Sequence, residues 1–277
     1  MLDFTRVDAR LLDGVDVVVA ELQRQVGIDP RQIMLVGAEC RDVLHSALGH
    51  EVGLRLTDDT DIAIAMTDWG AYDEIAETFP RSGHTGVRYV VDGVRVDIMP
   101  FGEVENPSGV VTPRQHGEDM IVFGFDDVFA RSLPLTLPAG SEIRIPTIAG
   151  YTALKMRAWI DRSPYGQNKD GKDLAAALYW YSESAVVRDR LFDQEAGQDL
   201  LDQLDWDQDL ASANLLGADV REQLSVQNRG DLVSRWSEVD RDFLSRSLEL
   251  PAELTWTGDR ARRLALIDEL LSGIASH

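Results

Sequence analysis

Two aspartates separated by one residue, Asp59 and Asp61, begin an alternating segment that runs to Met66. The alternation predicts a β-strand, and because side chains alternate along a strand, both carboxylates project from the same face. Carboxylates held this close repel one another unless they share a cation. Mg²⁺ prefers oxygen ligands from one or two carboxylates and from substrate phosphates, so the pair fits a magnesium site. For an isolated Asp-x-Asp, a solvated strand edge is the commoner case.

A third carboxylate, Asp97, lies in a predicted β-hairpin. Two β-rich runs, residues 87–91 and 94–99, are joined by Asp92-Gly93, which is the strongest short-range signal for a hairpin. Aspartate is disfavoured in the middle of a strand, so its presence at position 97 indicates a functional role. If its strand pairs beside residues 59–66, three carboxylates converge, and two-metal phosphoryl transfer uses such a set. The alternatives for Asp97 are salt bridges to Arg88 or Arg95.

A glycine stands between a predicted strand and a predicted helix. The strand is residues 32–37, with Gly37 as its last residue, and the helix is residues 39–48, so Gly37-Ala38 forms the junction. Glycine permits a tight turn there, and the free N–H groups of a helix N-terminus bind phosphate. Arg41 is near enough to reach such a phosphate. It could equally pair with Asp42 or Glu39.

These stretches together resemble AbiEii-type nucleotidyltransferases, a branch of the DNA polymerase β superfamily that includes toxins of type IV toxin–antitoxin systems. The resemblance extends over roughly residues 30 to 220. Its motifs are Gly37-Ala38, Arg41-Asp42, Arg55-x-Thr57-x-Asp59-x-Asp61, the Val-Asp-Ile-Met-Pro-Phe-Gly of residues 96–102, the Leu-Lys-Met-Arg-Ala-Trp-Ile-Asp-Arg of residues 154–162, and the Lys-Asp-Gly-Lys-Asp-Leu of residues 169–174. Where the superfamily usually has Gly-Ser or Gly-Gly, this chain has Gly37-Ala38, and its spacing from Gly37 to Asp59 is longer.

The resemblance implies a Mg²⁺-dependent enzyme, with two ions, that moves a nucleoside monophosphate from an NTP to an acceptor hydroxyl. It implies metal binding by Asp59 and Asp61, with Asp97 as a third ligand that orients or deprotonates the acceptor. In the helical half it implies a triphosphate contact from Lys155, with Asp173 and Lys169 at the cleft between domains. The nucleotide would be bound by Gly37, Ala38, Arg41, Lys155 and Lys169. The simpler alternatives are a Lys155 stem packed on Trp159 and aspartates placed at a helix start.

The resemblance further favours the 3′ end of a tRNA as acceptor and a separately encoded antitoxin as protein partner. A small molecule or a protein hydroxyl stays open as acceptor. So does a non-catalytic, nucleotide-binding regulatory protein, although such a protein has no need of a third carboxylate.

The fold class expected is α/β (α+β). A polymerase-β-like core with a mixed sheet is predicted over residues 1–146, and an all-helical domain over residues 147–277. Apolar spacing predicts helices over residues 8–27, 69–79, 148–162 and 172–181. One or two further strands are expected between residues 118 and 145, where prolines punctuate the chain.

Composition restricts the partners. The net charge of −21 disfavours a broad nucleic-acid-binding surface but leaves room for a local basic site. Of the 27 basic residues only three are lysines, and Lys155, Lys169 and Lys172 fall close together, either as a phosphate site or by chance. The single cysteine, Cys40, excludes an internal disulfide and a cysteine-based zinc site. No apolar run approaches the length of a membrane span, so the cytoplasm is expected.

Overall fold

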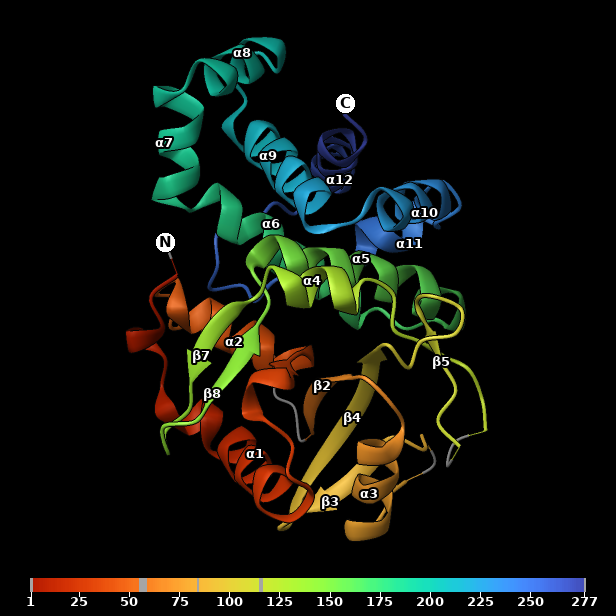
Figure 1. Cartoon of the computed structure of the whole chain (residues 1–277). Coiled ribbons are helices and arrows are strands. Elements are labelled where there is room, and N and C mark those ends of the chain that lie inside the picture. Colours follow the sequence, from red (N-terminus) through yellow and green to blue (C-terminus); the bar gives the residue numbers. More distant parts are fainter. Residues whose placement is uncertain (1, 55–58, 84, 115–116, 277) are drawn as a thin grey trace. The chain divides into compact units, whose positions relative to one another are not determined.

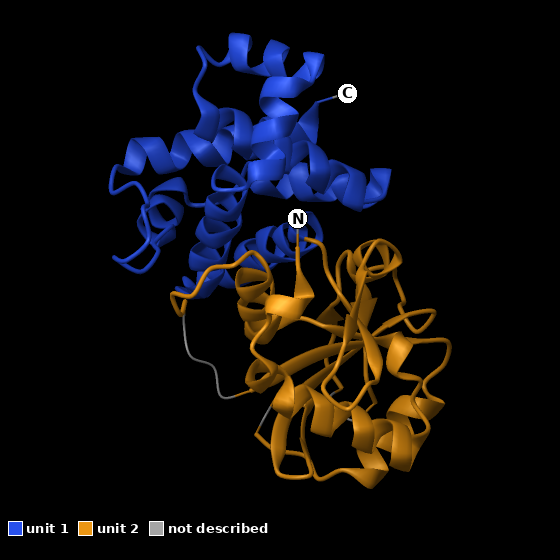
Figure 2. Ribbon diagram, turned by 90° about the vertical axis from the view of Figure 1, so that its left-hand side faces the viewer, with its two compact units in different colours: residues 1, 148–277 blue, residues 2–147 orange. Residues whose placement is uncertain are grey.

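The computed structural model describes residues 2–54, 59–83, 85–114 and 117–276, so Arg55 and Thr57 of the sequence motif lie outside the described residues. The chain divides into two compact units, Leu2–Thr147 and Ile148–His277 (Figure 2). The first is an α/β region with a six-stranded mixed sheet, and the second is all-helical. None of the helices in the described parts of the chain is long and apolar enough to cross a bilayer.

The sheet of the first unit has the strand order β3-β4-β2-β1-β8-β7 (Figure 1). Its central strands β2 and β4 run parallel, while β3 pairs antiparallel with β4 at the edge. The predicted hairpin is present, with Asp92 and Gly93 at φ 45° and 82° in its turn. The strands of this sheet are β1 (Ile33–Leu35), β2 (Thr60–Met66), β3 (Arg88–Val91), β4 (Val94–Gly102), β7 (Leu133–Thr136) and β8 (Glu142–Ile145). A separate pair consists of β5 (Val110–Val111) and β6 (Met120–Ile121).

Helices α1 and α3 pack against one face of β3 and β4. The Tyr72 ring of α3 stacks edge-on against Tyr89 of β3, and a Cβ at Gly14 of α1 would lie 3.5 Å from the Thr60 hydroxyl. Because side chains alternate, the neighbours of Thr60 and Tyr89 along their strands point to the opposite face. Those neighbours include Asp61 and Arg88. The helices of this unit are α1 (Asp13–Val26), α2 (Gly37–Ala47), α3 (Gly70–Thr78) and α4 (Phe125–Ala130), with 3₁₀ turns at Phe4–Arg6, Ala9–Leu12 and Pro30–Gln32.

The second unit is built on two close helix pairs. Helices α5 and α6 enclose Trp159 and Trp180, both almost fully buried. Helices α9 and α12 approach closely because a Cβ at Gly217 would lie only 2.0 Å from the Leu270 carbonyl oxygen. Its elements are α5 (Ile148–Arg162), a 3₁₀ turn (Ser163–Tyr165), α6 (Lys169–Ser182), α7 (Ala185–Asp193), α8 (Glu195–Gln203), α9 (Gln208–Gln223), α10 (Val226–Trp236), α11 (Arg241–Ser247) and α12 (Arg260–Ala275).

Several predicted boundaries differ from the structure. The first helix begins at Asp13, because residues 9–12 form a 3₁₀ turn instead. Helix α2 begins at Gly37 rather than at Glu39, and α6 begins three residues before Lys172. The sequence interpretation also missed α4, a six-residue helix that packs its two phenylalanines against Phe101 of β4.

Candidate active site

A row of charged side chains crosses three adjacent strands of the sheet. Arg88 of β3 is directly opposite Asp97 of β4, and Asp97 is in register with Asp61 of β2. Asp59 lies two residues before Asp61, immediately ahead of β2, and its carboxylate contacts the same arginine. The strand pairing that the sequence required is therefore present. We call Asp59, Asp61 and Asp97 the carboxylate patch.

Arg88 bridges two members of this patch. Its Nη2 lies 2.7 Å from Asp59 Oδ2, and its Nε lies 2.7 Å from Asp97 Oδ1. A second contact, 2.9 Å from Nη2 to Asp97 Oδ2, makes the bond to Asp97 bidentate. The hydrogen bonds to Asp97 and the nearby negative charges raise the pKa of Arg88. Arg95 makes a longer contact of 3.4 Å from Nε to Asp59 Oδ1. The salt bridge that competed with the metal interpretation of Asp97 is thus formed, by Arg88.

The turn between β1 and α2 lies directly against Asp61. The Val36 N–H donates to the Asp61 carbonyl oxygen at 3.0 Å, and Gly37 then opens α2 at φ 70°. A Cβ at Gly37 would lie 2.0 Å from Asp61 Oδ2. Glycine is therefore required twice at this position, for its left-handed backbone and for the approach of the carboxylate. The N-terminus of an eleven-residue helix consequently lies beside the patch, as a phosphate site requires.

Replacing Gly37 by alanine is expected to destabilise the first unit by more than the same change at Gly27. Both glycines have left-handed backbones, at φ 70° and 74°, but only Gly37 has a neighbour within 4 Å of the added Cβ. Strain of the backbone costs about 1–3 kcal/mol at either site, and Gly37→Ala adds the collision with Asp61. Urea unfolding of both variants measures the difference. Equal destabilisation would contradict a close approach between Gly37 and Asp61.

Glu39, in the first turn of α2, is a half-buried acid near the patch. It accepts a hydrogen bond of 3.1 Å from the hydroxyl of Thr60, which lies between Asp59 and Asp61. Burial raises the pKa of Glu39 to about 7, and the charges of Asp61 and Asp42 add to the rise. In the sequence analysis, Glu39 was only an alternative ion-pair partner for Arg41. No sequence pattern would have indicated its burial.

The raised pKa of Glu39 gives a stability change with a definite sign. A carboxyl group whose folded pKa exceeds its unfolded value of 4.5 stabilises the folded state at low pH, and this contribution disappears as the pH rises through about 7. We therefore expect Glu39→Gln to gain stability relative to wild type between pH 5 and pH 8, by on the order of 2–3 kcal/mol. Urea unfolding in EDTA at both pH values measures this difference. A gap that does not change with pH would contradict the raised pKa.

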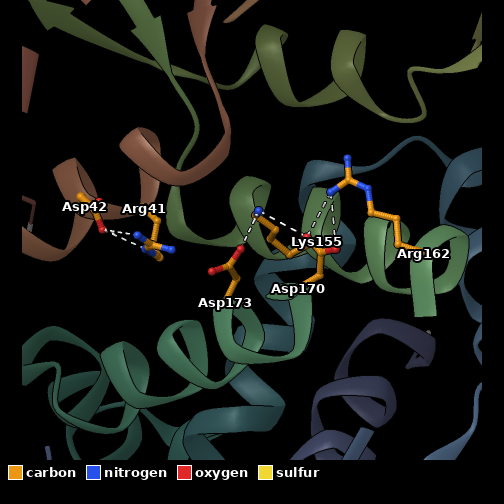
Figure 3. A network of polar contacts seen from close by, with 6 residues as sticks. All are labelled: Arg41, Asp42, Lys155, Arg162, Asp170 and Asp173. Atoms are coloured by element: carbon orange, nitrogen blue, oxygen red, sulfur yellow. Dashed lines mark hydrogen bonds and ion pairs between the residues drawn. The ribbon is translucent and has the colours of Figure 1, made fainter. Parts of the chain in front are cut away.

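Arg41, expected near a phosphate, is engaged by its sequence neighbour. Its Nε and Nη2 lie 2.8 and 2.7 Å from Asp42 Oδ1, and only 2% of its side chain is exposed (Figure 3). The pairing with Asp42, which was one of the alternatives, is formed. The Arg41 side chain is buried, so this pair is not a solvent-exposed one. Ala38, one residue after Gly37, is also buried.

In the second unit, Lys155 belongs to a buried ionic cluster. Its Nζ lies 2.6 Å from Asp173 Oδ2 and 3.4 Å from Asp170 Oδ1, and both aspartate side chains are 1% exposed (Figure 3). Arg162 contacts Asp170 from the other side at 3.4 Å. Burial lowers the pKa of Lys155, but the two aspartates outweigh it, so the pKa is raised overall and the lysine stays charged. We call Lys155, Asp170 and Asp173 the lysine cluster.

The remaining predictions for this unit have simple outcomes. Lys169 is exposed at the first position of α6. The Lys155 Nζ lies over the ring of Tyr151, 5.3 Å from its centroid. The aromatic run at residues 179–181 is buried.

The chemistry of the carboxylate patch fits a divalent cation. Its donors are carboxylate oxygens on two paired strands, the ligands that Mg²⁺ prefers, and it already holds a positive group in Arg88. Within the described part of the chain, no three His, Cys, Asp or Glu side chains are arranged to hold a metal ion as they stand. A bound ion therefore requires side chains of the patch to rearrange.

Comparisons of the chain with protein-family models, with curated proteins and with solved structures found no match.

Proposed function

We propose that the chain is a divalent-cation-dependent nucleotidyltransferase of the polymerase β type, similar to the AbiEii branch. The observation that carries this proposal is the row of Asp97 and Asp61 on paired parallel strands, with Asp59 on the same face and the N-terminus of α2 alongside. Packing of a hydrophobic core does not explain three carboxylates beside the N-terminus of a helix. Phosphoryl transfer uses this combination of acidic ligands and free backbone N–H groups.

Each group has a defined part in the proposal. Asp59 and Asp61 would hold the cation, with Asp97 as a third ligand. The cation would neutralise the phosphate charge and activate the attacking oxygen. Asp97 orients the acceptor hydroxyl and accepts its proton at a carboxylate oxygen, while the hydroxyl oxygen bonds to the α-phosphate of the NTP and pyrophosphate leaves. The first turn of α2, at Gly37 and Ala38, receives the phosphate oxygens. By resemblance, the helical unit contributes Lys155, Lys169 and Asp173 to nucleotide binding.

The acceptor is the open choice within this function. The resemblance favours the 3′ end of a tRNA and a toxin role with a cognate antitoxin. The net charge of −21 favours instead a protein hydroxyl or a small molecule, because a phosphate chain is repelled by such a field. The salt dependence of binding distinguishes an RNA acceptor from a protein or small-molecule acceptor. Binding of RNA through several phosphates weakens steeply as the salt concentration is raised.

The test is transfer of label from NTPs to cellular acceptors. Each of the four α-³²P-labelled NTPs is incubated with the full chain and Mn²⁺ or Mg²⁺, with total tRNA in one arm and soluble protein in another. Label in a product that ribonuclease degrades supports the RNA acceptor, and label in a product that protease degrades supports the protein acceptor. Absence of transfer from every NTP, with either ion and in every arm, would overturn the proposal.

A further inference from the structure

Arg88 contacts two of the three acids of the carboxylate patch. Its guanidinium contacts three carboxylate oxygens, Asp59 Oδ2 and both oxygens of Asp97, at 2.7 to 2.9 Å. The residue is the first of β3, the edge strand of the sheet, and 26% of its side chain is exposed. A long side chain on an edge strand can leave such a position without disturbing the sheet.

The carboxylate patch requires a nearby positive group even when no metal ion is bound. Three neighbouring carboxylates repel one another, and a partly buried site screens that repulsion less than bulk water does. The planar fork of arginine binds two carboxylates at once, so it can hold Asp59 and Asp97 together. Arg88 thereby supplies the charge that a divalent ion would otherwise supply.

The guanidinium and a divalent ion cannot use these oxygens together. Mg²⁺ binds carboxylate oxygens at about 2.1 Å, so an ion on Asp59 and Asp97 would lie within a few Å of the guanidinium. Two positive groups at that separation repel strongly in a partly buried site. Entry of the ion therefore requires Arg88 to release Asp59 and Asp97.

We propose that Arg88 is a built-in competitor of the metal: it holds the carboxylate patch assembled without an ion and sets the concentration of divalent ion needed to load it. This inference rests on the proposed function, because it takes the patch to be a metal site. The simpler reading is a permanent salt bridge that only joins β3 to its neighbours. The two differ in what removal of Arg88 does to binding of a metal.

The test is binding of Mn²⁺ alone to the full chain, measured by calorimetry on wild type, Arg88→Met and Arg95→Met. We expect Arg88→Met to bind Mn²⁺ at least about tenfold more tightly than wild type, the effect of losing one competing charge-assisted hydrogen bond. Arg95→Met is the matched control. It removes the same charge from a longer, more exposed contact, 3.4 Å from Asp59 with 51% of the side chain exposed, and should change the affinity by less than about threefold.

Thermal unfolding supplies a second measurement. Without metal, Arg88→Met should melt below wild type because its carboxylates repel one another, and saturating Mn²⁺ should restore the melting temperature. If Arg88→Met does not fold without metal, Arg88→Lys, which keeps the charge and loses the fork, should bind Mn²⁺ with intermediate affinity.

The outcomes separate the inference from the function beneath it. If wild type and Arg88→Met bind Mn²⁺ equally well, the competition is wrong while the metal site stands. If Arg95→Met tightens binding as much as Arg88→Met, only the overall charge matters and the inference is again wrong. If neither wild type nor Arg88→Met binds Mn²⁺, the metal assignment fails and the proposed function fails with it.

Discussion

Replacing Asp61 by asparagine is expected to lower the rate of nucleotide transfer by at least about a thousandfold, because a carboxylate ligand supplies several kcal/mol of charge stabilisation through the ion it holds. Asparagine keeps the shape that fits against Gly37 and loses only the charge. The fold should therefore survive. The rate is measured by the label-transfer assay, and the fold by thermal unfolding without metal.

Asp126→Asn provides the matched control for this change. Asp126 is exposed in the first turn of α4, in the same unit and outside the carboxylate patch, so the same substitution there should leave the rate within about twofold. An Asp61→Asn variant that retains the wild-type rate would exclude Asp61 as a metal ligand. A variant that loses activity only because it unfolds would show a lowered melting temperature.

Replacing Lys155 by methionine is expected to destabilise the helical unit by about 3–5 kcal/mol, because it leaves the buried carboxylates of Asp170 and Asp173 without their main cation. Adding Asp173→Asn should recover part of this loss, since one buried charge is then removed. Urea unfolding followed by tryptophan fluorescence is suited to the measurement. Five of the six tryptophans, all except Trp69, lie in this unit.

Lys172→Met is the control for Lys155→Met, because Lys172 lies outside the lysine cluster and is partly exposed on α6. It should change the stability by no more than about 0.5 kcal/mol. If Lys155→Met unfolds at the wild-type urea concentration, the lysine cluster is not what stabilises this unit. The result also governs how activity is read, because a loss of transfer in Lys155→Met implies a nucleotide contact only if that variant is folded.

The elements that place the carboxylate patch could be predicted from local patterns. The alternation that begins at Asp59 and the Asp92-Gly93 turn specify two strands and a hairpin, and backbone propensity alone decides both. The pairing of β2 with β4 was assumed and not predicted, because no local sequence pattern specifies which strands pair. Helix α4 was missed because six residues carry too little periodicity to stand out.

The candidate charged residues could be chosen from the sequence, but the groups that they contact could not. Arg88 was named only as an alternative partner of Asp97, and its second bond to Asp59 depends on strand register, which the sequence leaves open. Lys155 was expected at a phosphate, whereas α5 and α6 enclose it with two aspartates. The partial burial of Glu39 and the full burial of Asp170 follow from tertiary packing, and no local sequence pattern indicates either.

The β3–β4 hairpin has a consequence for how freely this chain can vary. Asp97 and Arg88 are paired across a hairpin whose turn has two residues, and β2 pairs with β4 over the whole length of β2. Adding or removing one residue in that turn would shift the register and turn one of the two side chains toward the helices on the far side of the sheet. The length of this turn is thus as restricted as the identity of the acids, although neither turn residue touches them.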